Sequence, residues 1–313
     1  MKFSILTLFP EMFDGLVGCS ILQRAQKQGL IEVARIQIRD FALDRHKSVD
    51  DYSFGGGPGM VLKADVLERA LLSAIGDGVS EDSLRISDTE AERLGYAGCA
   101  PYVRPGAESW SKDEGRGQRS AHVVYLSPQG ARFSQEHAVR FAAIEHLVLI
   151  CGHYEGIDER FVDAYVDEEI SLGDFVLTGG EIPAMAMVDA VARMRPGVLG
   201  DAQSFQSDSF YESLLDFPHY TRPAQWSLVA DRPEPNGVAQ TVSPPPVLLS
   251  GNHRAVVEWR RRHSLLRTLI RRPDLLNQAE LSRVERRLMD RLVRDLAQDL
   301  DEIILKEENK AKS

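Results

Sequence analysis

The sequence predicts an α/β domain with a largely parallel sheet, followed by a small all-α domain at the C-terminal end. Short apolar runs alternate with segments of helical periodicity through residue 195, as in proteins whose parallel strands are joined by helices. Beyond about residue 246 only helical patterns remain. The length of 313 residues agrees with about two domains, and an apolar content of 43% allows a sizeable core.

The first four predicted elements lie within residues 1–75. Lys2–Phe9 is a β-rich apolar run, which predicts a buried strand. Phe13–Gln28 has apolar residues at helical spacing, and Ile31–Ile38 alternates between apolar and polar residues as a strand does. Leu62–Ile75 is predicted to be a helix, because its apolar residues fall on one face.

The alternation of strands and helices resumes after residue 121. His122–Leu126 and His146–Cys151 are short apolar runs typical of strands, and Gln135–Ala143 between them has the pattern of a helix. After an acidic stretch comes a further apolar run at Ile170–Leu177. The last helix that we expect in this domain spans roughly Ile182–Met194.

Shifts in composition predict the domain boundaries. One segment is rich in Ser, Gly and acids and has no sustained hydrophobic periodicity, which predicts an insertion at the surface. A later stretch rich in Pro, Asn and Gly is typical of a linker. The predicted parts are an α/β domain at 1–200 with its insertion at 76–120, a linker at 201–245, and an arginine-rich helical domain at 246–313. Within the last part, helices are expected at Val256–Ile270 and Leu281–Leu296.

The charge of the chain is unevenly distributed. A net charge of −10 argues against a protein that coats nucleic acid indiscriminately. Between His253 and Arg294, however, twelve arginines stand against five acids, so this segment carries about +7 and the rest about −17. Arginine favours bidentate contacts to phosphate and stacking on bases. Helical ion pairs such as Glu258–Arg262 and Asp290–Arg294 are the alternative, but they leave the excess of positive charge unexplained.

The N-terminus and the cysteines bear on the compartment. The first apolar run is too short for a signal peptide, and Pro10-Glu11 stands where a small-residue cleavage site would be needed. No apolar run approaches the roughly 20 residues of a membrane span. Cys19, Cys99 and Cys151 are far apart, which predicts neither a disulfide framework nor a structural zinc site. We therefore expect a cytoplasmic protein that does not enter the membrane.

Four segments concentrate glycine and proline near the ends of predicted strands. They are Asp50–Met60, Tyr125–Gly130, Cys151–Gly156 and Ser171–Pro183. The first could equally be a flexible turn. The other three would converge at the carboxyl ends of strands, where open α/β sheets bind ligands. The chain lacks a GK[ST] phosphate loop and a G-x-G-x-x-G fingerprint, so a pocket with few charges, suited to an adenosine-like ligand, is predicted.

A series of long matching strings carries a resemblance to a known family. They include Leu8–Phe13, Gly55–Met60, Tyr125–Gly130, Gly152–Arg160, Gly173–Pro183, Pro196–Gly200, Asp208–Phe210, Pro218–Pro223 and Pro246–His253. On these residues the chain resembles the bacterial tRNA (guanine-N1)-methyltransferases, of the SPOUT class of S-adenosylmethionine-dependent RNA methyltransferases. The resemblance covers residues 1–75, 121–225 and about 244–277. The chain differs from the family's pattern in the insertion, in an expanded segment at 226–243, and at His153, where some members carry Arg.

The resemblance implies a fold, an oligomer and a cofactor site. The fold is a parallel α/β sheet with a deep trefoil knot, followed by a small helical domain, and the family's members are homodimers with active sites at the subunit interface. S-adenosylmethionine would bind the knot loops. The residues that the resemblance assigns to it are Leu126, Ser127, Pro128, Gly152, Tyr154, Glu155, Gly156, Leu172, Gly173, Asp174, Phe175, Val176, Leu177, Gly179, Gly180 and Pro183. Glu155 and Asp174 could equally brace turns.

The implied reaction is methyl transfer from S-adenosylmethionine to N1 of guanosine 37, on the 3′ side of the tRNA anticodon. This nitrogen carries a proton, which a base must remove. Asp208 matches the family's proposed base, and Arg193 matches its catalytic arginine, which could stabilise negative charge on guanine O6. From the residues alone, Asp208 could instead cap a helix at Phe210–Leu215, and Arg193 could pair with Asp189.

The same resemblance implies contacts with RNA. His46 and Asp50 would help to place the RNA loop. The arginines expected to grip the tRNA stem are Arg260, Arg261, Arg267, Arg271 and Arg272. Dependence on Mg²⁺ is a further implied trait, although the chain offers no dedicated carboxylate cage and no metal ligand is assigned.

Two rival functions fit parts of the sequence. A related enzyme could methylate a ribose 2′-hydroxyl or another base, but the match at Asp208-Ser209-Phe210 argues against it. A non-catalytic RNA-binding module would not need the intact glycines of all three loops together with Arg193 and Asp208.

Overall fold

The computed structural model describes most of the chain, in two compact units. The described residues are 1–76, 121–200, 208–210, 212–227, 241–294 and 298. The units are Met1–Ala202 and Gln203–Ser313, and each is described by itself. Nearly all of the predicted insertion at 76–120 lies outside the described residues, as do parts of the predicted linker.

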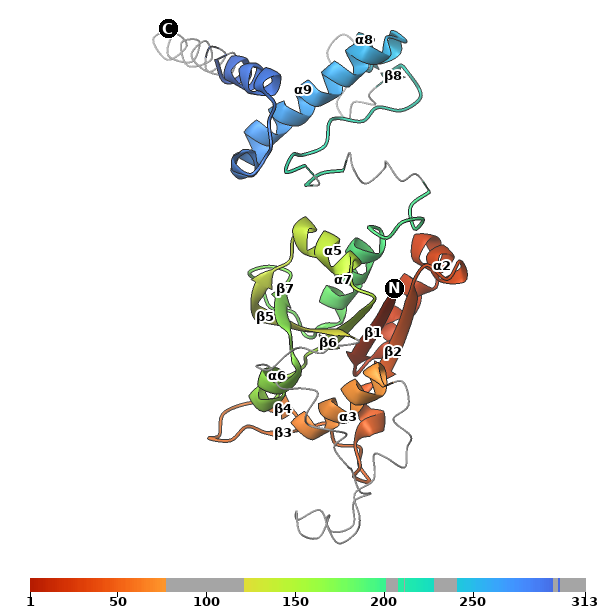
Figure 1. Ribbon diagram of the computed structural model, residues 1–313, viewed down its shortest axis with the longest axis vertical. Coiled ribbons are helices and arrows are strands. Elements are labelled where there is room, and N and C mark those ends of the chain that lie inside the picture. Colours follow the sequence, from red (N-terminus) through yellow and green to blue (C-terminus); the bar gives the residue numbers. More distant parts are fainter. Residues whose placement is uncertain (77–120, 201–207, 211, 228–240, 295–297, 299–313) are drawn as a thin grey trace, which may run out of the picture. The chain divides into compact units, whose positions relative to one another are not determined.

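The first unit is built on a sheet of five parallel strands in the order β2-β1-β6-β5-β7 (Figure 1). The strands are β1 (Lys2–Thr7), β2 (Glu32–Gln37), β5 (His122–Arg132), β6 (His146–Cys151) and β7 (Glu168–Ser171). The predicted α/β class with a largely parallel sheet is therefore confirmed. The predicted bounds of β6 agree with those of the structure.

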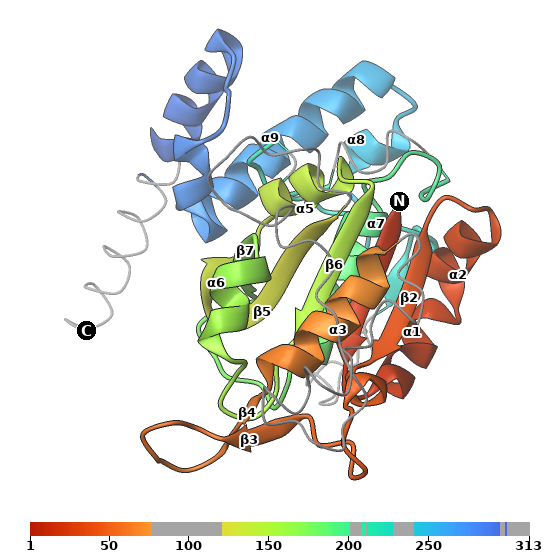
Figure 2. The ribbon, with the colours of Figure 1, turned by 60° about the horizontal axis from the view of Figure 1, so that its bottom comes forward.

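Helices cover both faces of this sheet (Figures 1 and 2). One face holds α2 (Ser20–Lys27), α5 (Gln135–Ala142) and α7 (Glu181–Ala192), and the other holds α3 (Ala64–Ile75) and α6 (Glu159–Tyr165). The period of two along each strand produces the two cores. In β6, Leu147 and Leu149 join the core under α5 and α7, whereas Val148 and Ile150 join the core under α3 and α6.

Short elements connect these layers. They are the 3₁₀ helices η1 (Pro10–Phe13) and η2 (Ile38–Phe41), the helix α1 (Asp14–Val17), and an antiparallel hairpin of β3 (Asp50–Tyr52) and β4 (Met60–Leu62). The prediction of one helix over Phe13–Gln28 is wrong. The Gly18 N–H donates to the Asp14 carbonyl at 2.9 Å, and this hydrogen bond ends α1. Cys19 then takes an extended conformation, so a separate helix, α2, begins at the next residue.

The acidic stretch before β7 contains a helix that the sequence pattern hides. The Asp158 side chain accepts a hydrogen bond from the Arg160 N–H at 3.0 Å and caps α6. Phe161 and Tyr165, one turn apart, are buried, while acids occupy much of the exposed surface. The apolar run that follows is a strand only as far as Ser171, because the next residues leave the sheet.

The second unit contains a short hairpin and a group of helices. The hairpin is formed by β8 (Trp226–Ser227) and β9 (Thr241–Val242), and the helical elements are α8 (Pro246–Leu249), α9 (His253–Arg271), η5 (Pro273–Asn277) and a helix over residues 283–294. Asn252 caps α9 by accepting a hydrogen bond from the Ala255 N–H. The predicted helix at Val256–Ile270 lies within α9. Leu214, Leu265, Met289 and Leu292 form a small core.

Replacement of Phe141 tests the core under α5. Phe141 is fully buried, so Phe141→Ala should lower the free energy of unfolding by about 3–5 kcal/mol, because it removes a large buried ring and leaves a cavity. Val139 lies on the same helix and is 45% exposed, and Val139→Ala should change stability by about 0.5 kcal/mol or less. Urea unfolding measures both variants; similar losses in the two would contradict the assignment of this helix face to the core.

Candidate functional site

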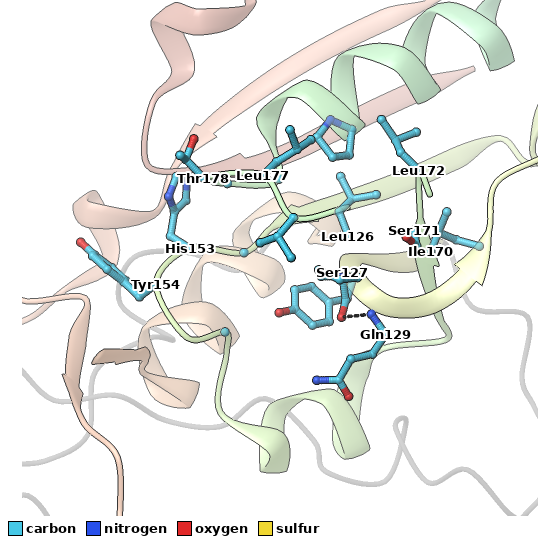
Figure 3. Close-up of a pocket in the computed structure, with 18 of the residues that line it drawn as sticks. Leu126, Ser127, Gln129, His153, Tyr154, Ile170, Ser171, Leu172, Leu177 and Thr178 are labelled. Carbon is cyan, nitrogen blue, oxygen red and sulfur yellow. Dashed lines mark hydrogen bonds between the residues drawn. The ribbon is translucent and has the colours of Figure 1, made fainter. Parts of the chain in front are cut away.

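A cavity of about 260 Å³ lies at the carboxyl ends of β5, β6 and β7 (Figure 3). Three stretches line it: residues 125–129 of β5, residues 152–156 after β6, and residues between 170 and 183, from the end of β7 to the first turn of α7. These are the three loops that the sequence analysis expected to converge. Ligands bind at this edge of open α/β sheets.

The first wall is a bulge within β5. Leu126 and Ala131 both pair with Ile170 of β7, so the intervening residues loop out of the sheet toward the cavity. The Gln129 N–H donates to Ser127 Oγ at 3.2 Å and holds the loop (Figure 3). A Cβ on Gly130 would lie 2.4 Å from the Ile170 backbone nitrogen, so only glycine fits where the strand returns.

The second wall follows β6 and passes close to Tyr125. A Cβ on Gly152 would lie 2.8 Å from the Tyr125 ring, and Gly156 has a φ of +131°, which favours glycine. Burial and the charge of Glu169 raise the pKa of Tyr125, so its phenol stays neutral beside the cavity. The Glu155 N–H donates to the Met60 carbonyl at 3.0 Å, which fastens this loop to β4.

The third wall leads into α7. The Gly180 N–H donates to the Gly152 carbonyl at 3.0 Å, and a Cβ on Gly180 would lie 2.6 Å from the Cys151 Cα. This close approach brings the start of α7 against the end of β6. Complete burial raises the pKa of Cys151 well above its usual value, so the thiol here is neutral. Phe175 and Val176 lie near the cavity with 56% and 82% of their surface exposed.

A buried carboxylate joins these walls to β1. Glu181, the first residue of α7, is 2% exposed. It accepts a hydrogen bond from Thr7 Oγ1 at 2.6 Å, and both of its oxygens lie 2.8 Å from His153 Nε2. Burial acts to raise the pKa of Glu181, but the hydrogen bonds from His153 and Thr7 outweigh it and the pKa is lowered. The ionised carboxylate therefore fixes the loop after β6.

Most of the residues expected to hold a cofactor line this cavity. Fourteen of the sixteen do so, and Gly173 and Asp174 do not. Asp174 is exposed and lies 3.8 Å from Arg132 Nε, which agrees with the alternative that it braces a turn. Six lining residues were not assigned to the cofactor individually, although five of them lie in the three glycine-rich segments predicted to converge here: Tyr125, Gln129, His153, Ser171 and Thr178, with Ile170 just before the third segment. Their position at the same three strand ends was the available signal.

The chemistry of the lining limits the ligands that fit. Glu155 is the one carboxylate among the lining residues, and none of them is Lys or Arg. A polyphosphate would lack counter-charges here. Leu126, Leu172 and Leu177 offer apolar surface for a flat ring, and the glycine-rich loops offer backbone N–H and C=O groups. The residues present therefore fit a nucleoside that carries either a positive charge or very little negative charge.

Arg193 and Asp208 belong to different units and are each described within their own. Arg193 is the C-cap of α7, and its N–H donates to the Asp189 carbonyl at 3.2 Å. The described residues between 208 and 215 form turns and bends. The alternative in which Asp208 caps a helix there is therefore wrong for the part of this segment that the structure describes.

The loop predicted to contact RNA is ordered by Asp44. Its carboxylate accepts hydrogen bonds from the His46 N–H at 3.1 Å and from the Ser48 N–H at 2.8 Å. These bonds leave the His46 side chain exposed and lead the chain into β3, which begins at Asp50. His46 thus lies in an exposed turn that the Lys47 N–H closes on the Asp44 carbonyl, and Asp50 begins β3 after the buried Val49.

The arginines of the second unit fall into two groups. Arg261 pairs with Glu285 and Glu212, and Arg272 pairs with Asp274. Arg260, Arg267 and Arg271 form no ion pair within the described residues. The predicted pair Glu258–Arg262 is replaced by Glu258–Arg254 at 3.1 Å, and Arg294 donates to the Asp290 backbone carbonyl rather than to its carboxylate.

The part of the chain that the structure describes shows neither a metal cluster nor a membrane-spanning helix. The described residues contain no group of three or more His, Cys, Asp or Glu side chains that could hold a metal ion, so the implied Mg²⁺ dependence gains no support. No described helix is both long and apolar enough to cross a membrane.

Comparison with known proteins gives a consistent result. A family model described as tRNA (Guanine-1)-methyltransferase TrmD matches residues 1–93 and 101–278. A curated tRNA (guanine-N(1)-)-methyltransferase of Magnetococcus marinus is 54% identical, over 95% of this chain and 97% of its own length. Relatives with the same name from Pelotomaculum thermopropionicum and Geotalea uraniireducens are 44% and 43% identical, over 95% and 96% of this chain and 98% and 100% of their own lengths.

Glu181→Gln tests the buried carboxylate. Because the folded-state pKa of Glu181 is lowered, its charge stabilises the fold above the unfolded pKa of about 4.3, and this contribution is lost as the pH falls through the folded pKa. Urea unfolding should show the variant about 1–3 kcal/mol less stable at pH 7, with a smaller difference in acid. The exposed Glu136 is the control, since Glu136→Gln should have little effect at any pH. A difference that does not change with pH would contradict the ionised pair.

Proposed function

Because the chain belongs to the tRNA (guanine-N1)-methyltransferase family, we propose that it methylates N1 of guanosine 37, on the 3′ side of the anticodon, with S-adenosylmethionine as donor. The predicted family and enzyme class are confirmed: the chain is a tRNA (guanine-N1)-methyltransferase. The two rival functions lose their support, since the family model and the relatives name this activity.

The cavity at the ends of β5, β6 and β7 carries the proposal. S-adenosylmethionine, when bound, supplies an electrophilic methyl group on a positively charged sulfur. Leu126, Leu172 and Leu177 would pack against its adenine, and the backbone of the glycine-rich loops would bind its polar edges. Glu155 is the lining carboxylate that could face the positive charge. Gly173 and Asp174, assigned to the cofactor by resemblance, would act through the shape of their loop.

The chemistry at guanine requires a base and a stabilising cation. N1 must lose its proton as the methyl group arrives, and Asp208 is the proposed acceptor. An ordinary Asp, with a pKa of about 3.9, is too weak to deprotonate guanine alone. Arg193 is therefore assigned to the negative charge that develops on O6, because stabilising that charge lowers the pKa of N1.

A homodimer with active sites at the subunit interface is part of the proposal. Phe175, Val176 and Ile182 lie beside the cavity and expose 56%, 82% and 50% of their surface. Apolar side chains gathered at a surface are typical of protein interfaces. A deep trefoil knot is proposed for the C-terminal half of the first domain. The proposal of a knot rests on the family, and the parallel order β6-β5-β7 found there is compatible with it.

The remaining contacts are proposed for the RNA. The arginine-rich helices of the domain at 246–313 would bind the tRNA stem, and His46 and Asp50 would place the anticodon loop. Arg260, Arg267 and Arg271 are the best suited, since ion pairs within the protein already engage Arg261 and Arg272. A cytoplasmic location is part of the proposal, since the proposed substrate is tRNA. Magnesium forms no part of the proposal.

Asp208→Asn tests the base. An amide cannot accept the proton, so methylation of an unmodified tRNA transcript under single-turnover conditions should slow by about 10²- to 10⁴-fold. S-adenosylmethionine binding, measured by calorimetry, should change little. Asp208→Glu is the matched control, because it keeps the carboxylate and should recover part of the rate. Near-normal turnover in the Asn variant would refute the role of Asp208.

Gly180→Ala tests the cofactor cavity. The added methyl would lie 2.6 Å from the Cys151 Cα, so the third wall must shift, and S-adenosylmethionine affinity should fall by about 10-fold or more, a loss of about 1.4 kcal/mol. Gly15→Ala is the control, since a Cβ there meets nothing within 4 Å. Circular dichroism checks that both variants fold. Unchanged affinity in folded Gly180→Ala would count against this cavity as the cofactor site.

A further inference from the structure

We propose that a second cavity, within the second unit, binds one unpaired nucleotide of the tRNA. It has a volume of about 420 Å³ and lies between the segment at 217–224 and the helices α8 and α9. Its lining includes three aromatic rings and two guanidinium groups, which belong to Phe217, His219, Tyr220, Arg222 and Arg260. This inference rests on the proposed function and adds a subsite for its RNA substrate.

Aromatic rings form one side of this cavity. The ring centroids of Phe217 and His219 are 4.6 Å apart, and Tyr220 exposes 50% of its surface. The Tyr220 ring and the ring of Trp259 in α9 are T-shaped with centroids 6.2 Å apart, and Trp259 is itself stacked on His263 with centroids 3.9 Å apart. Tyr220 thus contacts Trp259 and still exposes half of its surface. Exposed aromatic faces of this kind stack on unpaired bases.

Two guanidinium groups give the same cavity a positive charge. The Arg260 guanidinium lies 4.9 Å from the Phe217 ring centroid, and neither Arg260 nor Arg222 forms an ion pair within the described residues. The neighbouring Arg261, by contrast, has two carboxylate partners. The nearby acid Asp216 does not line the cavity, and its carboxylate is hydrogen-bonded to His219 at 2.7 Å.

This combination of groups fits a nucleotide. A base would stack on the aromatic side, and its phosphate would take bidentate contacts from Arg222 or Arg260. A paired base in an RNA stem has no free face, so the nucleotide must come from a single-stranded loop. An apolar peptide would leave both guanidinium groups without a counter-charge, which disfavours a protein occupant.

Binding assays with two RNAs test this subsite. The probes are an unmodified tRNA transcript and a fully paired RNA duplex without loops. Tyr220→Leu removes the aromatic face but keeps apolar bulk, and should weaken tRNA binding by about 5-fold or more with no change for the duplex. Arg260→Gln should weaken tRNA binding more than Arg262→Gln, although each removes one charge from α9, because Arg262 is exposed and lies outside the cavity.

Crosslinking of the unaltered protein provides a test that does not depend on a variant. A tRNA transcript containing 4-thiouridine in its loops should crosslink under long-wave ultraviolet light to the peptide at 217–224. Crosslinks elsewhere in the protein with none in this peptide would overturn the subsite.

The outcomes separate this inference from the proposed function. If the wild-type enzyme methylates the transcript but Tyr220→Leu binds it normally, the subsite is wrong and the function stands. If the wild-type enzyme does not methylate tRNA, the function itself fails. If Tyr220→Leu changes the sedimentation of the protein and leaves its affinity for tRNA intact, the cavity contacts another protein chain, and the inference is overturned.

Discussion

The hydrogen bonds of the ionised Glu181 carboxylate are the interaction on which the cavity at the ends of β5, β6 and β7 depends. A buried charge is unfavourable unless hydrogen-bonded partners compensate it, and here the partners come from Thr7 at the end of β1 and His153 after β6. The carboxylate thus joins two neighbouring strand ends to the start of α7. The same close packing requires glycine at positions 179 and 180. A Cβ on Gly179 would collide with His153, and a Cβ on Gly180 would collide with the Cys151 backbone.

The close packing around Glu181 also determines what the cavity offers a ligand. Where loops approach so closely that only glycine fits, side chains are excluded and backbone groups form much of the wall. The lining therefore contains Glu155 but neither Lys nor Arg, whereas the second unit carries arginines that no carboxylate of the described residues neutralises. One chain thus provides two environments, the first suited to a cationic nucleoside and the second to a polyanion.

The sequence predicted most strands and helices around this site, but not the hydrogen bonds that join them. The bounds of β6 could be predicted because His146–Cys151 is a continuous apolar run that ends in Gly152. The helix α6 could not, since the exposed acids around Phe161 and Tyr165 obscure its apolar face. Glu181 was missed because an acid in the first turn of a helix has a sufficient local explanation in the helix dipole. Its partners, Thr7 and His153, are distant in sequence, so no local pattern identifies them.

The position of the proposed base has a consequence for specificity. Asp208 belongs to the unit that carries the arginine-rich helices, whereas Arg193 and the cavity at the ends of β5, β6 and β7 belong to the other. Under the proposed function, methylation depends on a carboxylate of one unit and a guanidinium of the other. A free nucleotide would lack the contacts that a tRNA could make with the arginine-rich helices, and with them much of its binding energy. Under the proposed function, catalysis would thereby favour tRNA, because binding energy from remote parts of a substrate can be used to lower the barrier at the reacting atom.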